Sequence, residues 1–194
     1  AQYYHVGTWT VSFTGNTVGG IRKSVYPAYS AWGTGAIGAQ TWDGGASLTV
    51  TVGGNKLTGS GSTSADGVYI GDIPANGPAG SITAAITGNT ISGWQHGIHL
   101  ESSVAGATIT GNTIQNNVGA DSGVHVEAAV TATNVHVNYN NIVGNTGAGV
   151  HGVSNSGTGT LDAKNNWWGC KNGPGGSGCD TVSGDVAFEP WVAL

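Results

Sequence analysis

A short phrase recurs six times along this chain: an apolar residue, two small or polar residues, an asparagine, any residue and a second apolar residue. The asparagines of the six copies are Asn16, Asn55, Asn89, Asn112, Asn140 and Asn166. They are separated by 39, 34, 23, 28 and 26 residues. Repeats of about 20 to 50 residues are typical of stacked architectures, in which each repeat packs only on its neighbours. The sequence therefore predicts a solenoid.

The phrase has a direct physical interpretation. Segments such as 108–110 (Thr-Ile-Thr) alternate polar and apolar residues, as a half-buried strand does. The Gly-Asn pair that follows allows a tight bend, because glycine adopts positive φ freely and asparagine tolerates it. Coils built this way stack about 4.8 Å apart, so equivalent asparagines can hydrogen-bond to one another. Since an unpaired buried amide costs about 1–3 kcal/mol, we expect a continuous internal asparagine ladder.

A second phrase, Gly-apolar-x, follows the later asparagines and begins at Gly67, Gly97, Gly123 and Gly149. Each coil therefore contains at least two short strands joined by loops of variable length. The first coil fits least well, and its second strand begins either at Ile21 or at Ala36-Ile37. Together the two phrases predict an all-β parallel β-helix of about six coils.

The end of the chain carries a further pattern: Asn165-Asn-Trp-Trp-Gly-Cys170, then Gly173-Pro174 and Pro190-Trp191. This ending resembles the closing coil of secreted surface proteins in the right-handed parallel β-helix (pectin-lyase-like) superfamily. The resemblance covers about residues 9–194 and implies a right-handed parallel β-helix solenoid. It implies little about function, because this fold hosts lyases, hydrolases, adhesins and inert spacers.

The family's enzymes use clustered aspartates with a basic residue, and that pattern cannot be placed here. The single arginine, Arg22, lies in the irregular first coil, and the ten acidic residues are scattered. We divide the single domain, 1–194, into an irregular, aromatic-rich first coil (1–46), regular coils (47–168) and a closing segment with a disulfide loop (169–194).

Composition narrows the function classes. The net charge is −5 with only five Lys and Arg, so a nucleic-acid surface is disfavoured. No apolar run approaches the roughly 20 residues of a membrane span, and we expect no membrane insertion. Cys170 and Cys179 flank a glycine-rich loop. We interpret them as a disulfide, which indicates an extracellular or cell-surface location; a two-cysteine metal site is the less favoured alternative.

The second phrase places a row of side chains on the outside of the coils: Tyr69, His99, His125 and His151. Glu101 and Glu127 follow two positions on. His99, Glu101, His125 and Glu127 would then form a two-by-two cluster, because neighbours across a ladder lie about 5 Å apart. Three interpretations stay open. The cluster is a solvated side-chain ladder, which we favour, a metal site, or an acid–base site for a polysaccharide with Glu101, Glu127 and His125 as catalytic candidates.

The first coil concentrates aromatic residues, among them Tyr26, Tyr29, Trp32 and Trp42. These side chains are either stacking platforms for a sugar or protein ligand or a lid over the open end of the solenoid. No capping helix is evident near the N-terminus. An uncapped strand edge can pair with another chain, so we expect end-to-end self-stacking or docking of an upstream domain.

These observations favour a non-catalytic extracellular structural or adhesive β-helix, acting as a surface module or a self-assembling filament subunit. The alternative is a carbohydrate-binding or carbohydrate-active protein with a polysaccharide partner. We expect no cofactor.

Overall fold

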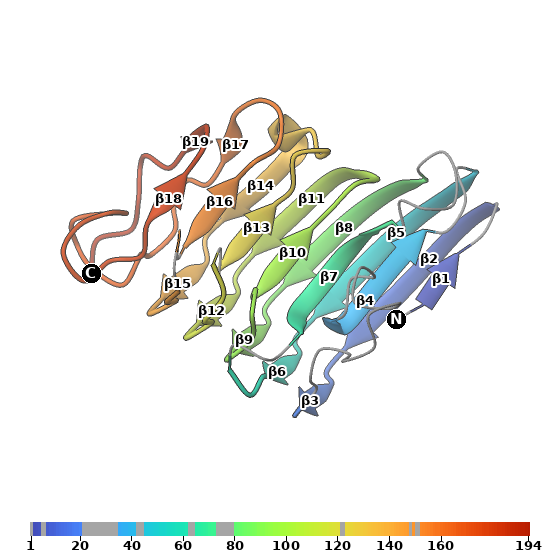
Figure 1. Cartoon of the computed structure of the whole chain (residues 1–194), viewed down its shortest axis with the longest axis horizontal. Helices are drawn as coiled ribbons and strands as arrows, with labels where there is room; N and C mark the ends of the chain where they lie inside the picture. The colour runs from blue at the N-terminus through green and yellow to red at the C-terminus, as the bar shows by residue number, and fades with distance from the viewer. Residues whose placement is uncertain are drawn as a thin grey trace.

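The computed structural model describes residues 2–4, 7–20, 35–41, 45–61, 65–72, 80–120, 123–147, 149 and 152–194. Over these residues the chain winds into a parallel β-helix, which confirms the predicted fold class (Figure 1). Every strand pairing in the described part is parallel, and the strands form three sheets along one long axis. One turn of 3₁₀ helix, η3 (Ala132–Asn134), interrupts the strands.

Sheets A and B each contain seven strands. Sheet A is formed by β1 (Gln2–Tyr4), β4 (Gly35–Thr41), β7 (Asp66–Asp72), β10 (Ile98–Leu100), β13 (Val124–Val126), β16 (Val153–Asn155) and β18 (Val182–Ser183). Sheet B is formed by β2 (Gly7–Thr14), β5 (Ala46–Gly53), β8 (Ser81–Thr87), β11 (Val104–Thr110), β14 (Val135–Asn138), β17 (Leu161–Asp162) and β19 (Val186–Ala187).

Sheet C contains five short strands: β3 (Thr17–Gly19), β6 (Lys56–Thr58), β9 (Thr90–Ser92), β12 (Thr113–Gln115) and β15 (Asn141–Val143). The coils that begin with β2, β5, β8, β11 and β14 run from sheet B through the asparagine bend to sheet C and then to sheet A (Figure 1). In the coil that begins with β17, an isolated bridge from Trp167 to Asn141 replaces the sheet C strand. In the first coil the sheet A strand is β4, so the Ala36-Ile37 alternative is confirmed. The competing start at Ile21 lies outside the described residues.

Inward-facing aliphatic side chains stack in columns between the three sheets. On sheet B, Val52 aligns with Ile86, which aligns with Ile109. On sheet C, Ile91 pairs with Ile114. All five are fully buried. Branched aliphatic residues suit such columns because they pack well against identical neighbours on a pleated surface.

The predicted asparagine ladder is present. The side-chain Nδ2 of each ladder asparagine donates to Oδ1 of the next, over 2.9 Å for Asn55 to Asn89, Asn89 to Asn112 and Asn112 to Asn140, and over 3.1 Å for Asn140 to Asn166. Asn16 donates to Asn55 in the same way. The backbone N–H of each donor asparagine bonds to the same oxygen. The buried amides are therefore paired, as their burial requires.

A second polar ladder lies one corner further along the coil. Asn117 Nδ2 donates to Asn145 Oδ1 over 2.8 Å, and Asn145 Nδ2 donates to Asp180 Oδ2 over 2.6 Å. The backbone N–H of Trp94 donates to Asn117 Oδ1. This ladder was not anticipated from the sequence, because its loops differ in length from coil to coil.

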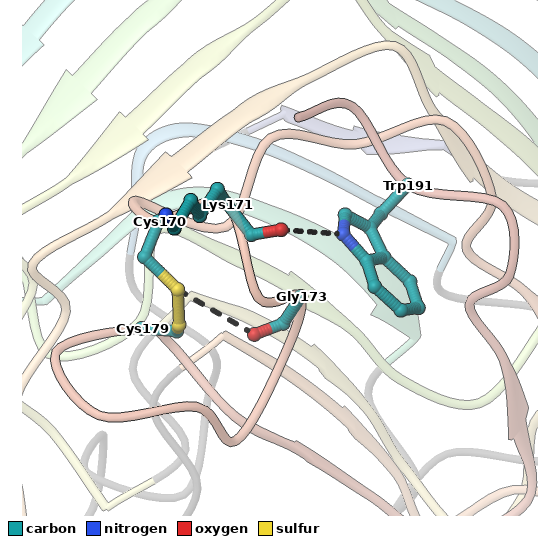
Figure 2. The surroundings of a disulfide bond; sticks show 5 residues. All are labelled: Cys170, Lys171, Gly173, Cys179 and Trp191. Atoms are coloured by element: carbon teal, nitrogen blue, oxygen red, sulfur yellow. Dashed lines mark hydrogen bonds between the residues drawn. A yellow bond between two sulfur atoms is a disulfide. The ribbon is translucent and has the colours of Figure 1, made fainter. Parts of the chain in front are cut away.

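The C-terminal end of the solenoid is closed. The predicted disulfide joins Cys170 to Cys179, with a Cα–Cα distance of 5.2 Å. Figure 2 shows the loop it closes against Trp191, whose indole Nε1 donates to the Lys171 carbonyl over 3.1 Å. Trp168 lies fully buried beneath this segment.

The first coil is more open. Trp9, Val11 and Phe13 of β2 align with Leu48, Val50 and Val52 of β5. Trp9 is nevertheless 45% exposed, whereas Leu48 is 1% exposed. The apolar cross-section of the coil is thus partly accessible at this end within the described residues.

Candidate metal site on the outer face of sheet A

The strand register brings the outward-facing residues of sheet A into one row. Tyr69 on β7 lies opposite His99 on β10, which lies opposite His125 on β13. The fourth member is Ser154 on β16 and not the predicted His151, which lies outside the described residues. That part of the prediction is wrong because the sheet A strand of this coil, β16, begins at Val153.

Most of this row is withdrawn from water. Tyr69 is 1% and His125 is 8% exposed, and the side chain of His99 is 14% exposed. The expectation of a solvated side-chain ladder is therefore wrong for Tyr69 and His125. Burial matters chemically because a charged or polar group removed from water must find partners in the protein.

Two residues that were not predicted from the sequence join the row. Asp66, the first residue of β7, is 7% exposed. Its Oδ1 lies 2.7 Å from His96 Nδ1, and its Oδ2 lies 3.1 Å from His99 Nδ1. His96 comes from the loop between β9 and β10. We call Asp66, His96, His99, His125 and Glu127 the histidine cluster.

His99 is the centre of the histidine cluster. Its Nε2 lies 3.2 Å from Glu127 Oε1, and His125 Nε2 lies 3.2 Å from the same oxygen. The ring centroid of His99 lies 4.9 Å from that of His96 and 5.2 Å from that of His125. Since both ring nitrogens of His99 face carboxylates, both carry protons here and the ring is an imidazolium.

The pKa values follow from these contacts. Burial disfavours the charged form of His99, but hydrogen bonds to Asp66 and Glu127 outweigh it and raise the pKa of His99 to about 9. The hydrogen bond from His99 lowers the pKa of Glu127 to about 2. Burial opposes ionisation of Asp66, yet the two histidines hold the pKa of this carboxyl below its ordinary value. Both carboxylates are thus ionised at neutral pH and available as ligands.

Glu101 does not complete the predicted two-by-two cluster. The hydroxyl of Tyr69 donates to Glu101 Oε2, and burial raises the pKa of the Glu101 carboxyl. Burial and the neighbouring Glu101 also raise the pKa of Tyr69, so its phenol stays protonated. The rings of Tyr69 and His99 are perpendicular, with centroids 5.3 Å apart. Tyr69 therefore supports the ring of His99 from the side opposite to His125 along the row.

The histidine cluster has the donors of a transition-metal site. It contains two triads, Asp66/His96/His99 and His99/His125/Glu127, in each of which the ligand atoms lie within 4.8 Å of one another. Metal–ligand bonds of about 2.0–2.2 Å would require only a modest contraction of each triad. Imidazole nitrogen and carboxylate oxygen are ligands suited to divalent copper, nickel and zinc.

A signal for the missed residues is present in the sequence. Asp66 and His96 each immediately precede the glycine of the second phrase, Gly67 and Gly97. They therefore hold equivalent positions on adjacent coils, three residues before Tyr69 and His99. Aligning the coils on these glycines would have found them.

The other predicted site residues are not brought into this cluster. Tyr26, Tyr29, Trp32 and Trp42 lie outside the described residues, so the aromatic ligand platform stays a prediction. His136 on β14, in sheet B, forms a separate histidine–carboxylate pair with Asp162. Its Nδ1 lies 3.4 Å from Asp162 Oδ2, and its side chain is 49% exposed. Among the described residues, no helix is long and apolar enough to cross a membrane.

Comparison of the sequence with known protein families assigns the chain to one of them. Residues 7–172 match the family described as "Periplasmic copper-binding protein (NosD)", and the chain belongs to this family of parallel β-helix proteins within the pectin-lyase-like superfamily. The description names a binding protein and not an enzyme, which agrees with the non-catalytic role expected. A periplasmic location is coarsely compatible with the extracellular one predicted. No curated protein and no solved structure matches the chain significantly.

Proposed function

We propose that this chain is an extracytoplasmic β-helix that binds copper through the histidine cluster on sheet A. The observation that carries the proposal is the position of His99, between two other imidazoles and two carboxylates on a largely buried face. The description of the family as copper-binding supports the choice of metal. Among divalent first-row ions, copper also binds nitrogen and oxygen donors most tightly.

The scaffold supports this role physically. Asp66, His99 and His125 lie on sheet A strands, and Glu127 directly follows β13. The register of these strands is fixed by their backbone pairing with one another. A metal site on regular strands is held more rigidly than one on loops. Glu127, at 39% side-chain exposure, is the most accessible member and marks the side from which an ion would enter.

The test is a titration of the metal-free chain with Cu(II), followed by gel filtration and elemental analysis. We expect retained copper in the wild type, its loss or strong reduction in His99→Gln, and no change in His136→Gln. The control replaces a histidine that also faces a carboxylate but lies on another sheet. Absence of retained copper in the wild type, or equal losses in both variants, would overturn the proposal.

A second candidate is assembly as an adhesive or filamentous surface module. The partly exposed apolar cross-section at Trp9 favours it, because strand edges next to accessible apolar groups are templates for pairing. Electron microscopy over a concentration series tests it. Filaments that disappear in Trp9→Lys support this candidate, and isolated short rods at all concentrations argue against it.

A further inference from the structure

We propose that the histidine cluster takes two metal ions, joined through the imidazole ring of His99. This inference rests on the proposed function for the identity of the metal. It adds the number of ions and the group that connects them.

The geometry of an imidazole ring supports two separate ions. The Nδ1 lone pair and the Nε2 lone pair leave the ring in different directions, so one ion cannot bind both nitrogens. His99 Nδ1 faces Asp66 at 3.1 Å, and His99 Nε2 faces Glu127 at 3.2 Å. The two triads therefore meet at one residue but lie on different edges of its ring.

Each side of His99 has its own pair of ligands. Asp66 is within 2.7 Å of His96, and Glu127 is within 3.2 Å of His125. Asp66 and His96 would thus serve an ion at Nδ1, and Glu127 and His125 an ion at Nε2, so each ion would receive two nitrogen donors and one oxygen donor. The His96 and His125 rings stack on each other with centroids 5.5 Å apart, so the two ligand pairs are themselves neighbours. The two metal positions would thus have the same kinds of ligands, although these ligands come from three successive coils.

The charges also fit two ions. Without metal, the ring of His99 lies between the carboxyl groups of Asp66 and Glu127. To hold an ion at each ring nitrogen, His99 would have to release both ring protons to solvent, which would leave the ring as an imidazolate. The ligands then carry three negative charges: one from the ring and one from each carboxylate. The anionic ring lies between the two cations and reduces their mutual repulsion.

The alternative is a single ion held by one triad, with the other triad left as a hydrogen-bonded cluster. The two arrangements differ in stoichiometry and in magnetism. Two Cu(II) ions joined by one imidazolate ring exchange-couple through it, whereas a lone Cu(II) ion gives its full paramagnetic signal.

The experiment uses the full chain and Cu(II) as the only added metal. Elemental analysis after gel filtration is expected to give two copper ions per chain. Low-temperature electron paramagnetic resonance is expected to show far less intensity than two isolated Cu(II) ions would. Asp66→Asn and Glu127→Gln are each expected to retain one ion with its full signal, because each variant weakens one triad. His136→Gln is expected to retain two coupled ions.

Circular dichroism of each variant checks that the β-helix persists. One copper ion per chain in the wild type, or two ions with the full uncoupled signal, would overturn the bridge while leaving copper binding intact. No retained copper would overturn the bridge together with the proposed function. Retention of two coupled ions in His99→Gln would show that another group connects them.

Discussion

An asparagine side chain inside this molecule bonds to two neighbouring coils at once. Asn89 Oδ1 accepts from both the backbone N–H and Nδ2 of Asn55, while Asn89 Nδ2 donates to Asn112 Oδ1 and to the Val52 carbonyl. A single amide thus satisfies several buried groups. This explains why the bend position is asparagine in the coils inside the ladder.

Replacing Asn89 with alanine is expected to lower the free energy of unfolding by about 2–4 kcal/mol, because it leaves several buried donors and acceptors without partners. Urea denaturation followed by circular dichroism measures it. Asn16→Ala is the matched control, since Asn16 ends the ladder and is exposed. We expect that variant to lose no more than about 1 kcal/mol. Equal losses at both positions would contradict the ladder's role.

The charges of His99 and Glu127 predict a pH optimum for the metal-free protein. The pKa of His99 is raised from 6.5 to about 9, so its stabilising contribution is complete below pH 6.5 and is lost as the pH rises through 9. The pKa of Glu127 is lowered from 4.5 to about 2, so its contribution is complete above pH 4.5 and is lost as the pH falls towards 2. The His99–Glu127 pair therefore stabilises the folded protein most between pH 4.5 and 6.5.

Thermal unfolding in the presence of EDTA between about pH 2 and 10 measures this dependence. Relative to the wild type, His99→Gln is expected to remove most of the decline between pH 6.5 and 9. His136→Gln, which changes an exposed histidine, is expected to leave the profile unchanged. An unaltered alkaline decline in His99→Gln would show that other groups produce it.

Among the elements, the bends between sheets B and C repeat one backbone geometry with different residues. The residue before the ladder asparagine has positive φ in each coil: +64° at Gly88 and +66° at Gly111, but also +57° at Tyr139 and +59° at Asn165. Positive φ costs residues other than glycine roughly 1–2 kcal/mol. Tyr139 therefore holds a strained position, and its side chain is 67% exposed.

Two opposite substitutions test this interpretation. Gly88→Ala is expected to destabilise the chain by about 1 kcal/mol, although a Cβ there would meet nothing closer than 4.0 Å. Tyr139→Gly is expected to stabilise it by about 0.5–1 kcal/mol, because relief of strain exceeds the greater entropy of the unfolded chain. Denaturation midpoints compare the two. A shift of the same sign in both variants would show that φ is not the deciding quantity.

The elements also show what sequence can and cannot predict. The strands of sheets B and C were predictable, because the asparagine phrase fixes their position in every coil. The sheet A register was predictable for Tyr69, His99 and His125, where Gly-apolar-x recurs, but not at Ser154, because loop length varies there. Asp66 and His96 were missed because they lie just before the repeating phrase. The burial of the row could not be predicted, because it depends on contacts outside the strand itself.

On the scale of the whole molecule, the two ends differ in how they are closed. The C-terminal coil is covered by Trp168 and Trp191 and by the disulfide loop, whereas Trp9 at the other end is partly exposed. In a solenoid, stability is approximately a sum over coils and their interfaces. Local opening should therefore begin at the first coil.

Hydrogen exchange tests this polarity. Amides of β2 and β3 are expected to exchange faster than those of β8 and β9. Replacing both Cys170 and Cys179 with serine is expected to accelerate exchange in β17 and β19 and to lower the free energy of unfolding by about 2–3 kcal/mol, the range for a short loop. Uniform exchange along the chain, or no change at the C-terminal coil in the double variant, would contradict this polarity.

The asparagine ladder has a consequence for how such a molecule can change its length. Every rung presents a carbonyl oxygen to the preceding coil and an amide group to the following one, so any rung fits any neighbour. A duplicated coil from Asn89 to Gly111, with its own bend and inward column, would meet compatible partners on both sides. Gene duplication or protein design could thus lengthen the rod one coil at a time. A coil added before Asn55 would increase the distance between the open end of the solenoid and the histidine cluster. The structures of the open end and of the cluster would both stay unchanged.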